Sequence, residues 1–148
     1  MKIMVATAWP ADFDGLRVVQ ANSRPSTRPN EILVADCGCG CDMARVWVPA
    51  RISGWQTQTD EEAWKALVGS YNAVMTLLGA RGCERACMPA LGASLYWPAR
   101  TTATAAKESI SSTKGLKESL ELTFVVSKAS DADIWVDEMR FLDVSLVQ

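Results

Sequence analysis

The sequence predicts a single α/β domain in which a mixed or parallel sheet is covered by helices. The chain has 148 residues, and a chain of about this length can bury roughly 70% of the surface that its unfolded form exposes. Short apolar and β-branched runs alternate with helix-like segments in its second half, as in α/β proteins. No repeat, low-complexity stretch or linker divides the sequence, so residues 1–148 are expected to form one domain.

The first third of the chain reads as strands. Residues 2–8 and 16–20 are short apolar runs separated by turn residues, which predicts two strands joined by a turn. The polar stretch 21–30, with two prolines and two arginines, has no periodicity and is expected to be an exposed loop. Residues 31–36 and 44–49 are again strand-like and flank a turn of alternating cysteine and glycine.

The clearest helix follows. Thr59 or Asp60 can cap its N-terminus, and Gly79 and Gly82 are expected to end it. Between them apolar residues recur at spacings of three and four, which is typical of an amphipathic helix: Trp64, Leu67, Val68, Tyr71, Val74, Met75 and Leu78.

The second half alternates strand and helix. Residues 85–88 predict a strand, 99–113 a helix rich in Ala and Thr, and 120–127 a β-branched strand. A last helix is expected to begin at Ser130, with Asp133 three residues on as in a capping box. Its apolar side would consist of Ile134, Trp135, Met139 and Leu142.

Charge and composition exclude several classes of function. With 15 Lys+Arg, 17 Asp+Glu and no histidine, the formal charge is −2, so we expect no nucleic-acid partner, because such binding depends on many basic residues. The lack of histidine removes Ser-His-Asp and Cys-His catalysis. No apolar run reaches the roughly 18 residues of a membrane span, and the start lacks a signal-peptide pattern. Five cysteines, three of them crowded, indicate reduced thiols and hence a cytoplasmic location.

The most informative segment is 86–98. It predicts a strand end, a run of small residues, and then a helix N-terminus. Small side chains let the backbone approach a ligand, and free N–H groups of a helix can hold a phosphate without basic side chains. A tight strand-to-helix connection with no ligand is the plainer interpretation.

The order of segments resembles the macro domain family, the ADP-ribose-binding α/β fold. The resemblance spans roughly residues 16–142 and rests on four blocks, namely 30–50, 59–74, 87–98 and 120–127 with the short helix after it. It implies a three-layer macro-like fold, with a mixed sheet and helices on both faces. It also implies binding of ADP-ribose or a related nucleotide metabolite, with no cofactor, through Ala90, Gly92, Ala93, Ser94, Leu95, Tyr96 and Trp97.

The sequence departs from the family pattern at its first ligand loop. Residues 18–23 are similar to the strand that precedes this loop, and Asn22 stands where the family has an asparagine tied to the distal ribose and to hydrolysis. The glycine-rich loop and the helix after it are missing. In the second loop, Ala93 and Ser94 replace a hydroxyl residue and a glycine, and Trp97 replaces another glycine. The resemblance therefore implies binding with little or no catalysis, because a hydrolase must position its water.

Other features carry competing interpretations. Cys37, Cys39 and Cys41 are candidate metal ligands, but structural zinc sites separate paired cysteines by two to four residues. A turn with small thiols is therefore preferred, and Cys87 is expected in the core. The charged residues near the second helix are interpreted as an ordinary helix face: Lys107, Glu108, Lys114, Lys117 and Glu118.

Three functions remain open. The first is nucleotide binding by a macro-like domain with little or no catalysis. The second is a vestigial pocket in a protein-interaction, accessory or immunity factor of a mobile element, because Trp97 lies in a loop where an exposed indole could stack on a base or anchor a partner. The last is a residual ADP-ribosyl hydrolase that uses Asn22 and a bound water.

Overall fold

The structure is a computed structural model that describes residues 1–8, 20–21, 31–36, 43–47, 60–82, 84–92, 97–140 and 142–147, the second to fourth of these ranges as backbone only. Within these ranges ten elements follow one another: β1 (Lys2–Ala6), β2 (Gln20–Ala21), β3 (Glu31–Asp36), β4 (Met43–Trp47), α1 (Asp60–Arg81), β5 (Arg85–Pro89), α2 (Ala99–Ser112), β6 (Glu121–Val125), α3 (Ala129–Glu138) and β7 (Val144–Val147).

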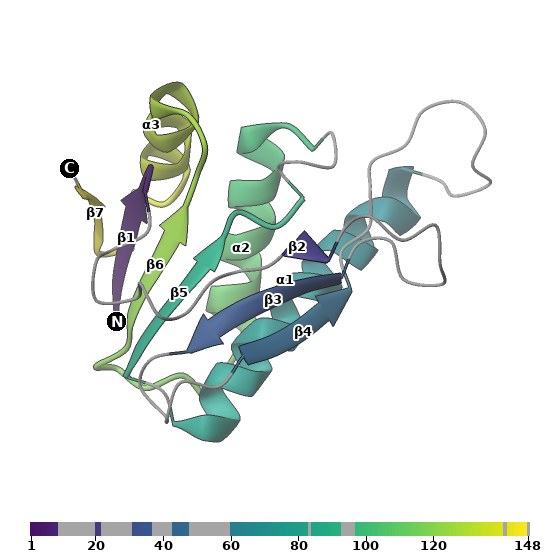
Figure 1. Cartoon of the computed structure of the whole chain (residues 1–148), viewed down its shortest axis with the longest axis vertical. Coiled ribbons are helices and arrows are strands. Elements are labelled where there is room, and N and C mark those ends of the chain that lie inside the picture. The colour runs from purple at the N-terminus through teal and green to yellow at the C-terminus, as the bar shows by residue number, and fades with distance from the viewer. Residues whose placement is uncertain are drawn as a thin grey trace.

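The strands form one mixed sheet, as expected (Figure 1). Its path is β2-β3-β5-β6-β1-β7, and β4 pairs with β3. The neighbours β5, β6, β1 and β7 run parallel, whereas β3 is antiparallel to β5, β2 and β4. Because parallel strands all end at one edge of a sheet, the loops after β1, β5 and β6 start from a common edge.

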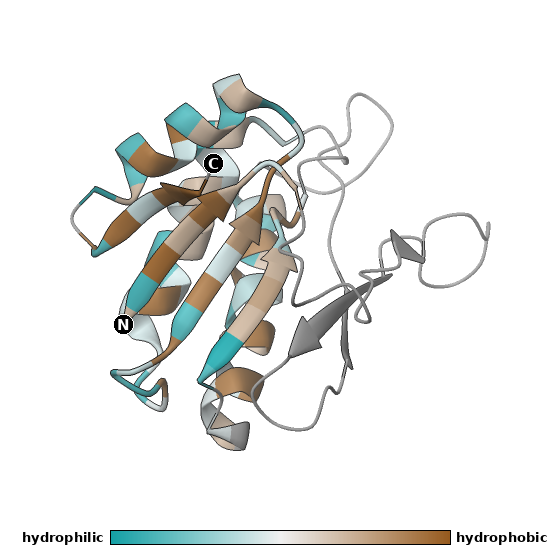
Figure 2. Cartoon of the chain, turned by 60° about the vertical axis from the view of Figure 1, so that its left-hand side comes forward, coloured by the Kyte–Doolittle hydropathy of each residue, from teal (hydrophilic) through white to brown (hydrophobic). Residues whose placement is uncertain are grey.

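Phe124 of β6 shows which face the helices cover. Its ring centroid lies 6.4 Å from that of Tyr71 in α1 and 4.9 Å from that of Trp135 in α3. Helix α2 packs against both α1 and α3. The three helices therefore lie on one face of the sheet, as Figure 2 also shows for α1 and α2 behind the apolar strands.

The opposite face of the sheet is buried at its centre as well. Cys87 of β5 pairs in register with Thr123 of β6, and their side chains alternate with the core residues on the helix side. They are 0% and 3% exposed. Helices on both faces of the sheet were expected. The described helices all lie on one face, and the opposite face is nevertheless buried at Cys87 and Thr123.

Several predicted elements are confirmed. Strand β3 spans the predicted residues, and β5, α2 and β6 agree within one or two residues. Helix α1 buries five of its seven predicted apolar residues, and the other two, Trp64 and Val68, are partly buried. Long periodic or β-branched segments contain enough apolar residues to specify both their conformation and their buried face.

The first two strands are not paired with each other. Strand β1 instead lies between β6 and β7, and β2 pairs with β3. The sequence predicted two strands joined by a turn without assigning their partners, and most of the second predicted strand, 16–20, lies outside the described residues. Ile3 and Val5 are at most 1% exposed, in keeping with the position of β1 between two other strands. Tertiary burial thus decided the strand order.

The remaining differences concern ends of elements. Helix α1 continues through Gly79 and ends at Arg81, before Gly82 with its φ of 63°. Helix α3 begins at Ala129, and its N-cap residue Lys128 makes no side-chain cap bond, so the predicted capping box is wrong. Strand β7 was not predicted, because it is four residues long and three of them are exposed. None of the helices in the described ranges is both long and apolar enough to cross a membrane.

Candidate functional site

The turn after β5, residues 90–92 (the β5 turn), is held by hydrogen bonds to β6 and to α1. The amide N–H of Ala90 donates to the carbonyl oxygen of Val125 at the end of β6, at 3.0 Å. The hydroxyl of Tyr71 in α1 donates to the carbonyl oxygen of Leu91, at 3.2 Å. Burial raises the pKa of the Tyr71 hydroxyl well above its usual value, so the hydroxyl keeps the proton that it donates to Leu91.

Gly92 permits the close packing of this turn. It has a φ of 87°, in the region that favours glycine. A Cβ atom at Gly92 would lie 2.7 Å from Cδ1 of Trp97 and 3.1 Å from Cδ1 of Leu67. The space left by the missing side chain is therefore filled by the indole, whose residue also donates its backbone N–H to the Gly92 carbonyl at 3.2 Å.

The expectation that Trp97 is an exposed indole is wrong. The residue is 7% exposed and belongs to the core. A tryptophan between a turn and a helix looked like a surface anchor in the sequence, but its ring packs where a side chain at Gly92 would be. Trp97 therefore positions the turn by packing beneath it.

The N-terminus of α2 follows Trp97, and its N-cap residue offers no capping side chain. This residue is Pro98, which makes no side-chain cap hydrogen bond, and the first turn of the helix contains no acidic residue. The N–H groups of Ala99, Arg100 and Thr101 have no partner within the helix. The helix dipole adds partial positive charge there. This end of α2 can therefore accept an anion, at the edge where the parallel strands end.

An ionic network joins α2 to α3 next to this end. Arg100 Nη1 lies 2.6 Å from Asp137 Oδ2 and 3.1 Å from Glu138 Oε2. Glu138 Oε1 accepts hydrogen bonds from Lys107 Nζ at 2.9 Å and Thr104 Oγ1 at 2.8 Å. These donors, Lys107 first, lower the pKa of Glu138 to about 2. The expectation of an ordinary charged helix face is wrong for Lys107, because this residue pairs with Glu138 of α3. Lys114 and Lys117 are not on the helix, because α2 ends at Ser112.

The structure brings three predicted site residues together in this turn: Ala90, Gly92 and Trp97. The other candidates lie outside the described residues: Asn22, Cys37, Cys39, Cys41, Ala93, Ser94, Leu95 and Tyr96. Cys87 is buried, as expected. Within the described ranges no group of three acidic or thiol side chains is arranged to hold a metal ion.

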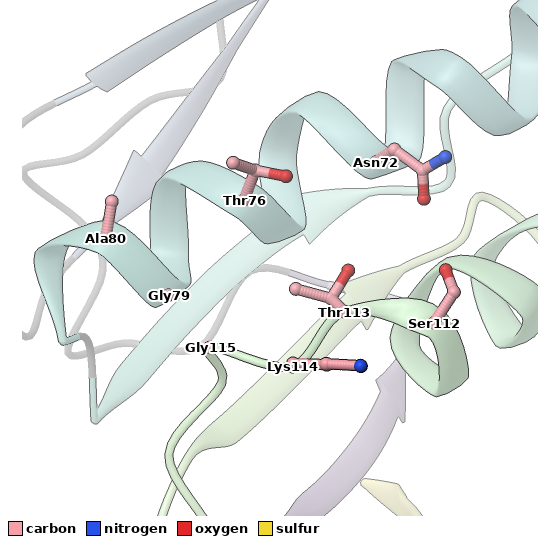
Figure 3. A pocket seen from close by; sticks show the side chains of 8 residues that line it. All are labelled: Asn72, Thr76, Gly79, Ala80, Ser112, Thr113, Lys114 and Gly115. Carbon is pink, nitrogen blue, oxygen red and sulfur yellow. The ribbon is translucent and has the colours of Figure 1, made fainter.

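A pocket that the sequence did not predict lies between the C-terminal ends of α1 and α2 (Figure 3). Its volume is about 620 Å³, and it is lined by Asn72, Thr76, Gly79, Ala80, Ser112, Thr113, Lys114 and Gly115. Asn72, Thr76 and Ala80 are four residues apart and so share one side of α1, a spacing of small and polar residues that could have indicated a groove.

Polar groups from both sides of this pocket are bonded to Ser109 of α2. Asn72 Oδ1 accepts a hydrogen bond from the Ser109 hydroxyl at 2.7 Å, and the Thr113 hydroxyl donates to the Ser109 carbonyl at 2.8 Å. A Cβ at Gly79 would lie 3.0 Å from the carbonyl carbon of Gly115. These contacts describe a packed boundary between helices, and the 14 residues of α2 separate it from the β5 turn.

The fold and the β5 turn define a mixed α/β protein of macro-like fold. A structure search gives the Oceanobacillus iheyensis macrodomain, as a glycine-to-valine mutant with ADPR, at 17% sequence identity and a TM-score of 0.50. The match covers 60% of this chain and 47% of the macrodomain chain, so it spans about half of that protein. No protein-family profile matches the sequence, and no curated protein does either.

Proposed function

We propose that this chain binds ADP-ribose, or a related nucleotide metabolite, and catalyses little or no hydrolysis. The diphosphate would be held by backbone N–H groups of the β5 turn and of the first turn of α2. Asn22 and the segment Ala93–Tyr96 are further proposed contacts.

One observation carries the proposal. The N-terminus of α2, with no capping side chain at Pro98 and no acidic residue in its first turn, follows a fixed turn at the edge where the parallel strands end, and ligands of open α/β sheets bind at that edge. Backbone N–H groups at such a helix end bind phosphate. The solved macrodomain of similar fold was determined with ADPR, which supports this choice of ligand.

A thermal-shift titration with ADP-ribose, ADP and NAD tests the proposal. A ligand at 100 times its dissociation constant stabilises the folded state by about 2.7 kcal/mol. We expect ADP-ribose to raise the melting temperature in a concentration-dependent way. If none of the three does so, the proposal is wrong and the vestigial-pocket hypothesis, with a protein partner, becomes the better one.

Thr101→Glu places a carboxylate in the first turn of α2. Because a negative charge there complements the helix dipole, the free protein should gain about 0.3 to 1 kcal/mol of stability. The same charge repels a bound diphosphate, so the affinity for ADP-ribose should fall at least about tenfold. Calorimetric titration measures the affinity and urea unfolding measures the stability.

Ala73→Glu is the matched control, since Ala73 is exposed in the middle of α1. It adds the same charge away from the helix end and should change the affinity by less than about twofold. Unchanged ADP-ribose affinity in Thr101→Glu would contradict the placement of the diphosphate at α2.

A further inference from the structure

Arg100 is the second residue of α2, the helix whose N-terminus would face the ligand, yet its guanidinium group is bound to α3. Nη1 lies 2.6 Å from Asp137 Oδ2 and 3.1 Å from Glu138 Oε2. Arg100 is the only basic residue in the first turn of α2. The one basic side chain of that turn is thus paired with carboxylates of the neighbouring helix.

The ion pair between Arg100 and Asp137 is exposed and therefore weak enough to exchange. The side chains of Arg100 and Asp137 are 50% and 51% exposed, and ion pairs at such exposure contribute little to stability. Asp137 also lies 3.5 Å from Arg140.

Glu138 is better shielded, with a side chain 16% exposed, but Lys107 also pairs with it and Thr104 donates to it. Departure of Arg100 therefore leaves neither carboxylate buried without a partner.

A diphosphate at the end of α2 would offer Arg100 a stronger partner. The planar guanidinium group binds two phosphate oxygens at once, and such charge-assisted pairs are about twice as strong as neutral hydrogen bonds. In the structure the guanidinium group lies beside Glu138, which also contacts Thr104 and Lys107 further along α2. Side chains on a helix lean toward its N-terminus, so a rotamer change of Arg100 would bring its head group to the first turn of α2.

We propose that Arg100 exchanges partners when the ligand binds. Its guanidinium group separates from Asp137 and Glu138 of α3 and pairs with the diphosphate of the nucleotide. The acidic pair then acts as an internal competitor that sets the affinity of the site. This inference rests on the proposed function and adds a specificity-determining residue and its regulation to it.

The test compares two variants that break the same ion pair from opposite sides. Asp137→Asn removes the main competitor for Arg100 and should tighten ADP-ribose binding about two- to fivefold, which corresponds to an exposed ion pair. Arg100→Ala removes the proposed phosphate ligand and should weaken binding about tenfold or more. If Arg100 served only to join α2 to α3, both variants would change the affinity in the same direction.

Two controls separate this exchange from a general charge effect. Asp133→Asn removes one negative charge from an exposed position of the same helix, α3. Lys117→Ala removes one positive charge from a residue that lies 3.5 Å from Glu84. Glu84 precedes β5, so this position is at the edge of the sheet where the parallel strands begin, opposite the candidate site. Each control should leave the dissociation constant within about twofold of the parent protein.

Calorimetric titration with ADP-ribose decides the matter. Unchanged or weaker binding by Asp137→Asn overturns the exchange, as does unchanged binding by Arg100→Ala, while binding by the parent protein keeps the proposed function intact. Absence of binding by the parent protein removes the proposed function and this inference with it. If Arg100→Ala shows no cooperative transition in thermal unfolding, and so is not folded, the affinity of Asp137→Asn alone decides the test.

Discussion

Gly92 shows how much one residue decides in this protein. Its φ of 87° and the indole packed where its side chain would be determine the shape of the turn directly after β5. Tyr71 holds the preceding carbonyl from below. The candidate site therefore depends on contacts that lie beneath it and do not themselves touch a ligand.

We expect Gly92→Ala to destabilise the protein by about 2 to 4 kcal/mol, because a Cβ adds backbone strain and a clash with Trp97. Urea unfolding measures the loss. Gly69→Ala is the control: Gly69 lies within α1 with nothing within 4 Å of the added Cβ, so this change should stabilise by about 0.5 to 1 kcal/mol. Equal effects of the two substitutions would contradict the role assigned to Gly92.

At the scale of elements, the orientation of α3 depends on polar contacts as well as on its apolar side. Trp135 packs on Phe124, while the Glu138 carboxylate accepts hydrogen bonds from three side chains of α2, those of Arg100, Thr104 and Lys107. Because all three donors come from one helix, they fix the position of the end of α3 along α2.

Glu138→Gln should cost about 1 to 2 kcal/mol at pH 7, since it removes the charge that these donors stabilise. The pKa of Glu138 is lowered to about 2 from 4.5. Its stabilisation is therefore complete above pH 4.5 and is lost as the pH falls toward 2. Urea unfolding of parent and variant at pH 7 and pH 3 should show the difference between them shrinking.

Glu108→Gln, at an exposed position of α2, is the matched control and should cost less than about 0.5 kcal/mol at either pH. A Glu138→Gln penalty that is the same at pH 7 and pH 3 would show that the ionised carboxylate is not what joins the helices.

At the scale of the whole molecule, one core joins the sheet to all three described helices. The buried residues of β1, β5 and β6 form a single cluster with those of α1, α2 and α3. Phe124 lies at its centre, between Tyr71 and Trp135. Elements that share a core in this way should unfold together.

Phe124→Leu should therefore lower stability by about 1 to 2 kcal/mol and reduce amide-exchange protection in α1 and α3 by similar factors. Val147→Ala changes a residue that is 39% exposed on the edge strand and should have an effect below about 0.5 kcal/mol. Hydrogen exchange measures both variants. Loss of protection confined to α3 would show that the helices are stabilised separately.

The sequence by itself determined the fold class and most of the long elements. The spacing of Leu67, Tyr71, Val74 and Leu78 specifies α1, and β-branched runs specify the strands, because conformation and buried side can both be read from local periodicity. The block order also indicated a macro-like fold and directed attention to the turn after β5.

Only the tertiary structure decided the order of strands, the burial of Trp97 and the partners of Arg100. Each depends on residues far apart in the chain: β1 lies beside β6, the Gly92 turn that packs on Trp97 also packs on Leu67 of α1, and Asp137 is 37 positions from Arg100. Such contacts leave no periodic signal, because the free energy that selects them comes from burial and charge pairing between distant segments.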